Sequence, residues 1–399
     1  MRVRHQLEPA SAGGMANLSS NFVIEDDLSR DVYCILGMPV DAIGMQSCLR
    51  RIEAAAASRM PFLVSTPNLN FLVNSHLDPD FRESLILSDL CPPDGMPIVW
   101  IAWLLGVPIK NRTAGSDIFE ALKLGHNAAK PLKVFLFGDT EAAGMAASQA
   151  LNAQPSGLYC VGSLYPGFGS VDELSRDDII DKINSSGADF LVAALGTKKG
   201  QLWLQRNHHR LQVPVRSHLG AVIKFQAAMV RRAPAIMRKF GLEWLWRIKE
   251  EPYLWRRYWI DGSVLLRLLL TNVLPLAILL WWLQVKYGHH RNDLVITQVH
   301  ANESVTVSLS GPATARHVDK LIPVIRAALA AKKQIIIDFS NTCAIDTRFL
   351  GLLIMLRKIL KGIGAKPIFI GLSPGLKSIF RLSCVEFLLV DNLTIGAHA

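Results

Sequence analysis

Short apolar runs alternate with helical patterns over the first half of this 399-residue chain, and this alternation constrains the fold more than any other feature. Each run has the length of a buried strand, and a segment with helical periodicity follows it. Strands that alternate with helices form a parallel sheet with helices on both faces. We therefore predict an α/β domain with a Rossmann-like parallel sheet, whose strands include residues 61–65, 133–137, 158–161 and 189–195.

A second alternation begins near residue 294 and predicts a separate, small α/β domain. Its expected strands are residues 305–309, 334–338 and 367–370, and its expected helices are residues 313–331, 347–361 and a short one after 373–375. At about 100 to 200 residues per domain, the chain is long enough for two. We divide it into a disordered leader (1–30), a first domain (31–240), a basic appendage (241–292) and a second domain (293–399).

The amino-terminal segment and the cysteines indicate a cytosolic protein. The first 23 residues carry charges, Pro9 and a Gly-Gly pair without an apolar core, so they do not form a secretory signal. The six cysteines are scattered without C-x-x-C pairing, and we interpret them as reduced thiols.

The formal charge of +10 is concentrated in residues 206–257, where twelve Lys or Arg face three acids. Such a segment binds the phosphates of a substrate, anionic lipid or nucleic acid, or it forms a solvated basic surface. We predict no nucleic acid partner, because no nucleic-acid-binding motif is recognisable and an apolar stretch follows directly.

That apolar stretch, residues 264–285, is long enough to span a membrane. Arg267 and Pro275 interrupt it, and Trp281 and Trp282 stand near its end, as is typical of a segment at the lipid headgroup boundary. A span would place the two domains on opposite sides of the membrane. We expect the segment to lie in the interface or to re-enter on the cytoplasmic side of the inner membrane, with a single span as the alternative.

The strongest chemical signal lies between residues 66 and 117. Thr66-Pro67-Asn68 follows an expected strand, Pro93-Asp94-Gly95 forms a tight loop, and Arg112-Thr113-Ala114-Gly115-Ser116-Asp117 comes next. Ligands of open α/β sheets bind at the carboxyl ends of strands. A carboxylate held there, such as Asp94, can act as a general base, whereas its structural alternative is a turn-capping aspartate.

These motifs, with Arg232-Ala233-Pro234 and Gly241-Leu242-Glu243-Trp244, resemble the WecG/TagA/CpsF family of bacterial glycosyltransferases over residues 30 to 260. The resemblance implies a hexosyltransferase that moves a sugar, with inversion, from a UDP-sugar to a polyprenyl-pyrophosphate-linked sugar at the cytoplasmic membrane leaflet. It implies that Asp94 is the base and that Thr66 and Asn68 position the substrates. It further implies substrate-binding roles for Arg112, Gly115, Asp117, Gly138, Asp139, Gly196, Arg232, Arg247, Arg256 and Arg257.

No metal ion and no cofactor other than the donor sugar nucleotide are expected, because arginines would stabilise the leaving diphosphate. Asp78-Pro79-Asp80 fits the D-x-D metal motif of other glycosyltransferases, but we interpret it as a helix start. The turn at Gly138 and Asp139 either faces a phosphate or is only a tight turn.

Two motifs depart from the family pattern. Where the family has G-x-P-x-Q-E-x-W, residues 196–203 read G-T-K-K-G-Q-L-W, and where it has G-G-x-F-D, residues 220–224 read G-A-V-I-K. Lys224 in place of an acid suggests a different donor sugar, an acidic sugar or a lost contact, so the donor is not carried over from the family.

The second domain resembles a STAS domain, the anti-sigma-factor antagonist fold, through the strand I-I-I-D and the helix start D-T-R-F-L-G at residues 346–351. The resemblance makes Thr347 a candidate for regulatory phosphorylation and implies a regulatory partner protein, and the alternative for Thr347 is a plain helix cap. We therefore predict a membrane-associated glycosyltransferase of exopolysaccharide or cell-surface polysaccharide synthesis. The competing interpretation is a non-catalytic scaffold that acts through the STAS domain.

Overall fold

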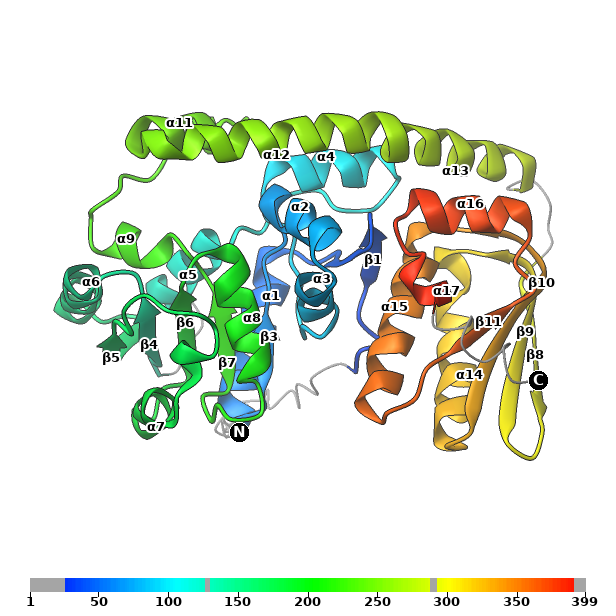
Figure 1. Cartoon of the computed structure of the whole chain (residues 1–399), viewed down its shortest axis with the longest axis horizontal. Coiled ribbons are helices and arrows are strands. Elements are labelled where there is room, and N and C mark those ends of the chain that lie inside the picture. Colours follow the sequence, from blue (N-terminus) through cyan, green and yellow to red (C-terminus); the bar gives the residue numbers. More distant parts are fainter. Residues whose placement is uncertain (1–25, 126–129, 288–292, 391–399) are drawn as a thin grey trace, which may run out of the picture.

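Two α/β domains lie side by side beneath one long helix (Figure 1). The computed structural model describes residues 26–125, 130–287 and 293–390. The predicted fold class is confirmed, because the first domain contains a parallel sheet with helices on both faces and the second contains a small mixed sheet.

The first domain is built on five parallel strands in the order β3-β7-β6-β4-β5. Four of them match the expected runs: β3 (Phe62–Val64), β4 (Leu132–Gly138), β5 (Leu158–Leu164) and β6 (Phe190–Ala194). The sequence analysis missed the fifth strand, β7 (Val215–His218), which lies between β3 and β6. This strand contains polar residues and so lacks the apolar run that marks a buried strand. Its Arg216 can be buried because the carbonyl oxygens of His208, Leu211 and Val213 accept its hydrogen bonds.

Separate apolar cores cover the two faces of this sheet. One face packs against α1 (Met45–Ser58), α5 (Gly115–Leu124), α6 (Glu141–Ala153) and α9 (Val222–Gln226). The other face packs against α7 (Asp177–Ser185) and α8 (Thr197–Arg206). Between the sheet and the second domain lie α2 (Leu69–Leu77), α3 (Pro79–Ile86) and α4 (Met96–Leu104). Asp78 caps α3 by accepting hydrogen bonds from the backbone of Asp80 and Phe81, as expected for a helix start.

An antiparallel hairpin of β1 (Val32–Ile35) and β2 (Met38–Asp41) stands apart from the main sheet. Asp41 and Arg30 form a buried ion pair at 2.8 Å. Residues 26–30 are therefore ordered, and the predicted leader is too long by these five residues; residues 1–25 lie outside the described part of the chain. The ion pair explains why residues 26–30 are ordered: the buried charge of Arg30 requires a partner, and pairing with Asp41 attaches this segment to the hairpin.

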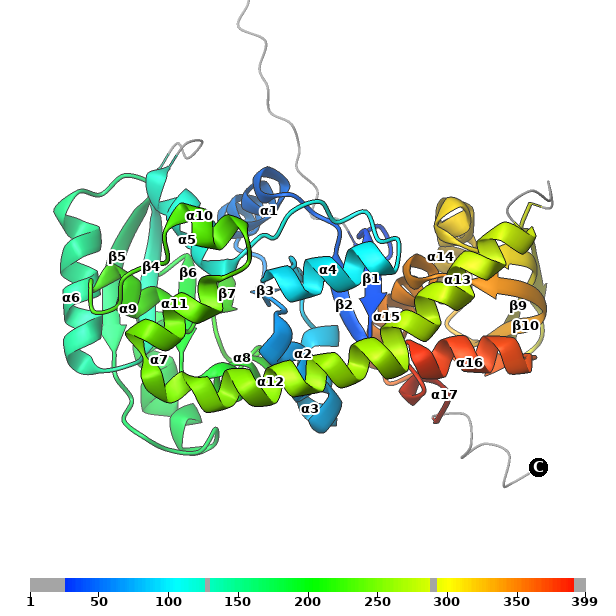
Figure 2. The same ribbon diagram turned by 90° about the horizontal axis from the view of Figure 1, so that it is seen from above.

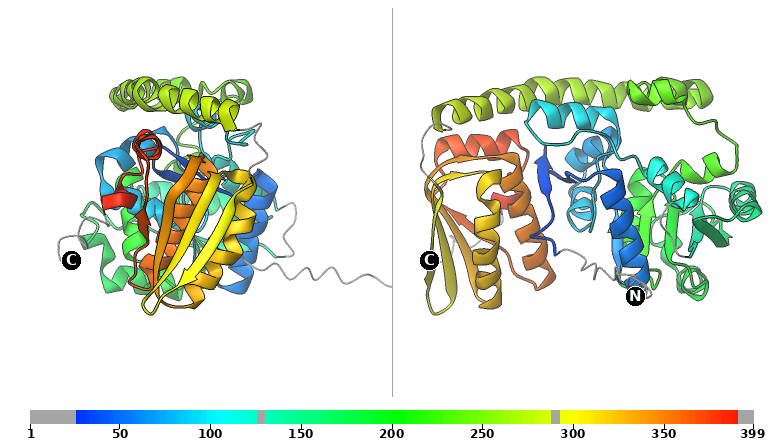
Figure 3. Two further views of the ribbon diagram at one scale, coloured as in Figure 1. Left: turned by 90° about the vertical axis from the view of Figure 1, so that its right-hand side faces the viewer. Right: turned by 180° about the vertical axis from the view of Figure 1, so that it is seen from behind.

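The second domain is a four-stranded sheet in the order β11-β10-β9-β8. Its strands are β8 (Val295–His300), β9 (Ser304–Ala313), β10 (Gln334–Ile345) and β11 (Ile368–Ile370). The helices α14 (Val318–Ala330), α15 (Thr347–Gly362) and α16 (Pro374–Leu382) lie behind the sheet (Figure 3), and α17 (Phe387–Val390) follows. The three expected strands and the three expected helices of this domain are present, whereas the edge strand β8 was not predicted.

Helix α15 joins the two domains, because it packs against the β1–β2 hairpin and α3 as well as against its own sheet. Arg357 pairs with Glu83 at 2.7 Å, and Lys358 pairs with Asp89 at 3.0 Å. Thr347 begins this helix and is only 4 % exposed. The side chain that the STAS resemblance marks for phosphorylation is therefore buried, and the next residue, Arg348, contacts Asp31 and Val32 of the first domain.

The long helix runs without a break from Pro252 to Tyr287, a length of about 54 Å for 36 residues. It consists of η2 (Pro252–Leu254), α12 (Trp255–Leu268), a π-helical turn η3 (Leu269–Val273) and α13 (Leu274–Tyr287). The π turn ends two residues before Pro275. The wider turn makes room for the proline ring and accommodates the missing backbone N–H of proline. Two short helices, α10 (Ala235–Lys239) and α11 (Glu243–Glu250), precede it.

Both domains lie on the same side of the long helix (Figures 1 and 2). Its inner face contacts α2, α4 and α16, and Leu268, Val273 and Leu276 are buried there. Its exposed surface carries many large apolar side chains together with Arg256, Arg267 and Lys286, and the helix is long and apolar enough to cross a membrane. The outward side chains are each at least 40 % exposed: Trp255, Trp259, Ile260, Leu266, Leu270, Leu274, Ile278, Trp281, Trp282 and Val285.

Candidate active site

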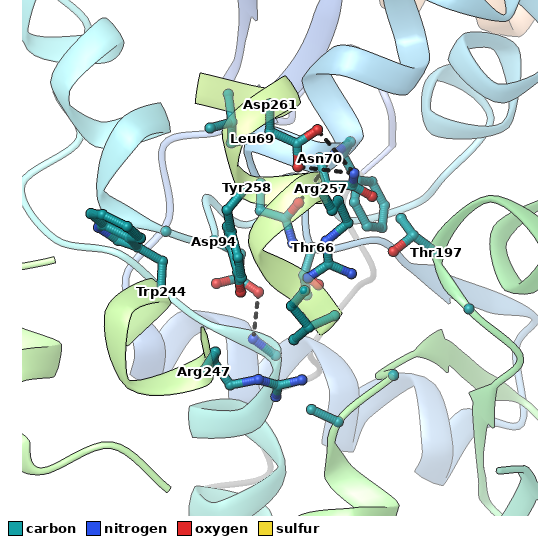
Figure 4. A pocket seen from close by; sticks show the side chains of 18 of the residues that line it. Thr66, Leu69, Asn70, Asp94, Thr197, Trp244, Arg247, Arg257, Tyr258 and Asp261 are labelled. Atoms are coloured by element: carbon teal, nitrogen blue, oxygen red, sulfur yellow. Dashed lines mark hydrogen bonds between the residues drawn. The ribbon is translucent and has the colours of Figure 1, made fainter. Parts of the chain in front are cut away.

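A cavity of about 1200 Å³ opens between the carboxyl ends of the parallel strands and the helices α11 and α12. The strand side contributes Thr66, Gly138, Gly196 and His218, which follow or end β3, β4, β6 and β7. The opposite side contributes residues of the appendage, among them Trp244, Arg247, Arg257 and Tyr258 (Figure 4). The cavity thus lies where open α/β sheets bind ligands, and the basic appendage closes it.

Asp94 lines this cavity on a loop that hydrogen bonds hold to the segment after β3 and to the start of α5. Its backbone N–H donates to the carbonyl oxygen of Pro67 at 2.9 Å, and the backbone N–H of Gly115 donates to its carboxylate at 3.4 Å. Burial raises the pKa of Asp94 to about 7, the charge of Glu243 adds to this effect, and Arg112 opposes it. At neutral pH the carboxyl group therefore exists in both protonation states, as suits a group that takes up a proton.

Thr66 and Asn68 lie beside Asp94, as the sequence predicted for the end of β3. Thr66 is 4 % exposed, and a Cβ on Gly115 would approach it to 3.2 Å. The same Cβ would lie 2.5 Å from Leu219, so only glycine lets α5 start this close to the strand end. Asn68 caps α2, since its side-chain oxygen accepts from the backbone of Phe71 at 3.1 Å, which leaves its amide nitrogen for another partner.

Arg112 lines the cavity and connects the Asp94 loop to the appendage. Its guanidinium pairs with Glu243 at 2.8 Å and with Asp117 at 3.6 Å. Asp117 also pairs with Arg232 and Arg238. Asp117 and Arg232 are not among the residues that line the cavity, so here they hold the segment before α10 against α5 rather than face a substrate.

A buried carboxylate of the appendage, Glu251, accepts hydrogen bonds from the appendage itself and from α9 at the other end of the cavity. Glu251 accepts from Arg247 at 2.7 Å, from Lys224 at 3.0 Å and from the hydroxyl of Tyr253 at 2.7 Å. Arg257 also lines the cavity, whereas Arg256 does not; the Arg256 guanidinium lies 5.6 Å from the ring centre of Trp255. Lys224, where the resembled motif has an acid, is thus part of this cluster.

Two glycine turns form the edge of the cavity near these cations. Gly138 and Gly196 have φ angles of 107° and 83°, which L side chains rarely adopt. Each precedes a helix start, with Thr140 capping α6 and α8 beginning at Thr197. Burial raises the pKa of Asp139, which lies between the two turns and near Lys224. The turns present backbone amides at helix starts, an arrangement suited to phosphate groups.

The sequence analysis missed several residues of the cavity. Glu251, Tyr253 and Asp261 were not predicted as site residues, although all three line the cavity and the Asp261 carboxylate accepts from Asn70 at 3.1 Å. His218 was missed together with β7. The charge pattern could have indicated Glu251, since it is one of only three acids in the basic segment.

Comparisons with known proteins agree with this geometry. The family profile "Glycosyl transferase WecG/TagA/CpsF family" matches residues 33–277. A relative from Bacillus spizizenii, an N-acetylglucosaminyldiphosphoundecaprenol N-acetyl-beta-D-mannosaminyltransferase, is 28 % identical over 200 residues, which cover 49 % of this chain and 73 % of the relative. A protein of the same name from Staphylococcus aureus is 24 % identical over 216 residues, which cover 53 % and 82 %.

The second domain lies largely outside these matches. Among solved structures, the anti-sigma factor antagonist SpoIIAA in its unphosphorylated form aligns with 22 % of this chain and 82 % of its own, with 20 % sequence identity and a TM-score of 0.20. The family match covers the parallel sheet, the Asp94 loop and the cations of the appendage together. The chain therefore belongs to the WecG/TagA/CpsF family of glycosyl transferases.

Proposed function

We propose that this chain transfers a sugar from a UDP-sugar to a hydroxyl group of a polyprenyl-pyrophosphate-linked sugar, with inversion, in the synthesis of an exopolysaccharide or cell-surface polysaccharide. One observation carries the proposal: the carboxyl group of Asp94, with a pKa of about 7, faces the same cavity as the cations of the appendage. The names of the relatives, which act on a sugar linked to diphosphoundecaprenol, support the class of acceptor.

Asp94 acts as the general base in this proposal. The acceptor hydroxyl loses its proton to the Asp94 carboxylate while its oxygen forms a bond to the anomeric carbon, and the bond from that carbon to the UDP oxygen breaks. Thr66 and Asn68 flank the base and hold the two sugars in line. A base with a pKa near the working pH combines a useful ionised fraction with enough basicity.

Lys224, Arg247 and Arg257 stabilise the negative charge that develops on the departing diphosphate. Glu251 neutralises two of these cations before substrate binds. The diphosphate carries more charge than one carboxylate, and guanidinium groups pair with its oxygens in a bidentate manner, so it competes for the same partners. The protein's own cations thus take the role that a metal ion has in other glycosyltransferases.

The acceptor reaches the cavity from the lipid surface. Trp255, Trp259 and Leu266 line the cavity and also belong to the outward apolar face of the long helix. A helix with an apolar face and flanking cations binds in the plane of the membrane interface. Because both domains lie on one side of this helix, an in-plane position on the cytoplasmic leaflet keeps both domains in the cytosol, whereas a span would separate them.

We further propose that the second domain regulates or docks the transferase. It is held by α15 against the hairpin and α3, and the ion pair of Lys358 with Asp89 lies next to Ser88, whose hydroxyl is 2.7 Å from that of Ser65 at the end of β3. Displacement of this domain by a regulatory protein would therefore disturb the strand that carries Thr66.

The test is sugar transfer and UDP release from a panel of UDP-sugars with a polyprenyl-pyrophosphate-linked N-acetylglucosamine acceptor. We expect transfer by the wild-type chain and its loss, by a factor of at least about 100, in Asp94→Asn. Asp80→Asn, at an exposed aspartate outside the cavity, is the matched control. Equal activity of Asp94→Asn and wild type would refute the base, and no transfer with any donor would favour the scaffold.

A further inference from the structure

His218 is a buried polar group of the cavity that the proposed mechanism does not use. It ends β7, it is 6 % exposed, and it lines the cavity. Its Nε2 atom is buried and has no hydrogen-bond partner in the described part of the chain. An unpaired buried polar atom costs about 1 to 3 kcal/mol of folding free energy. The unpaired Nε2 atom in the cavity wall therefore points to a ligand that supplies the missing hydrogen bond.

The position of His218 in the sheet places it near the reacting atoms. β7 lies between β3 and β6, and Ser217 pairs in register with Val64 of β3 and with Val192 of β6. His218 is therefore level with the strand ends that lead to Thr66 on one side and to Gly196 on the other. A group that contacts His218 therefore lies between the Asp94 loop and the glycine turn at Gly196.

Two glycines make room for the imidazole ring. A Cβ on Gly200 would lie 2.1 Å from Cδ2 of His218, and a Cβ on Gly220 would lie 3.3 Å from Cε1. Gly200 stands where the family motif described above has glutamine. A side chain at position 200 and the ring at position 218 therefore exclude each other, and the imidazole occupies space that a side chain at position 200 would need.

The ring is electrically neutral at working pH, because burial lowers the pKa of His218 to about 4. Cations already face the diphosphate from the appendage, whereas a neutral imidazole suits an uncharged hydroxyl or acylamino group. Building on the proposed function, we infer that His218 hydrogen-bonds an uncharged polar group of the donor's sugar and that the Gly200–His218 pair determines which sugar this chain accepts.

The experiment compares binding of UDP with binding of UDP-N-acetylmannosamine, UDP-N-acetylglucosamine and UDP-glucose by calorimetry. His218→Phe keeps a flat ring between the glycines without polar atoms, and His218→Gln restores an amide. His209→Phe, at an exposed histidine outside the cavity, is the matched control. We expect His218→Phe to bind UDP as the wild type does, but to bind the preferred UDP-sugar about threefold to tenfold more weakly, and His218→Gln to recover part of this loss.

If His218→Phe does not fold, the ranking of the three UDP-sugars by kcat/KM in His218→Gln supplies the readout, and a changed ranking supports the inference. Unchanged binding of every UDP-sugar by a folded His218→Phe, or an unchanged ranking in His218→Gln, overturns it and leaves the proposed function in place. An equal loss for UDP and UDP-sugars also overturns it, because His218 would then contact the nucleotide. Failure of the wild type to bind any of these probes overturns the proposed function itself.

Discussion

Arg112 and Glu243, which are 131 residues apart, form an ion pair at 2.8 Å that links the segment next to the Asp94 loop to the first turn of α11. Both residues also act on Asp94, since burial raises its pKa to about 7, Glu243 raises it further and Arg112 lowers it. The pair therefore holds α11 over the cavity and, at the same time, influences the pKa of the Asp94 carboxyl group.

Removing one charge of this pair should shift the pH dependence of transfer in a predictable direction. Glu243→Gln removes a negative charge near Asp94, so the ionised form becomes easier to reach and the acid limb of kcat/KM should move to lower pH. Arg112→Gln removes a positive charge and should move the limb to higher pH. pH profiles of both variants test this, and movement in the same direction in both would contradict the electrostatic account.

The wild-type enzyme should lose activity in acid as Asp94 becomes protonated. With a pKa of about 7, kcat/KM should fall about tenfold for each pH unit well below this value, since only the carboxylate accepts the proton. The profile is measured with saturating acceptor. An acid limb near the ordinary aspartate value would show that the base is a different group or is not buried in this way.

Asp94 should also destabilise the folded protein at alkaline pH. Its pKa is higher in the folded than in the unfolded chain, so the folded state holds more protons between the two values, and this stability is lost as the pH rises through about 7. Asp94→Asn should therefore melt at a higher temperature than wild type near pH 8, and the difference should shrink towards pH 5. Thermal unfolding measures it, and a pH-independent difference would exclude this origin.

The contact between α15 and the hairpin should not tolerate a methyl group. A Cβ on Gly351 would lie 2.1 Å from the carbonyl oxygen of Val32. Gly351→Ala should therefore cost about 1 to 3 kcal/mol of unfolding free energy. Gly362→Ala, on the same helix with nothing within 4 Å of its added Cβ, should be neutral or slightly stabilising. Denaturant unfolding of the two variants distinguishes loss of domain docking from a general effect on the helix.

Membrane binding should depend on the exposed tryptophans of α13. Trp281 and Trp282 are 64 % and 48 % exposed on the outer face of the long helix. Trp281→Ser with Trp282→Ser should reduce flotation with anionic liposomes, whereas Tyr159→Ser, at an exposed aromatic residue of β5, should not. Binding that resists both the double substitution and high salt would indicate a span rather than an interfacial helix.

Much of this structure could be predicted because its signals are local. Apolar runs and helix caps indicated four strands of the first sheet and three of the four strands of the second, and the residue order around Asp94 indicated its loop. β7 escaped prediction because the environment that makes a buried Arg216 acceptable comes from three carbonyl groups that only the fold brings together. The burial of Thr347 escaped for a similar reason, since no local sequence pattern shows how the start of α15 packs in the fold.

The helix that closes the cavity is the same one that shows apolar side chains to the outside. A lipid surface that binds this helix would therefore also stabilise the closed form of the cavity. Under the proposed function, a molecule not bound to the membrane would have a less closed cavity, so sugar transfer would be confined to the surface that carries the lipid-linked acceptor.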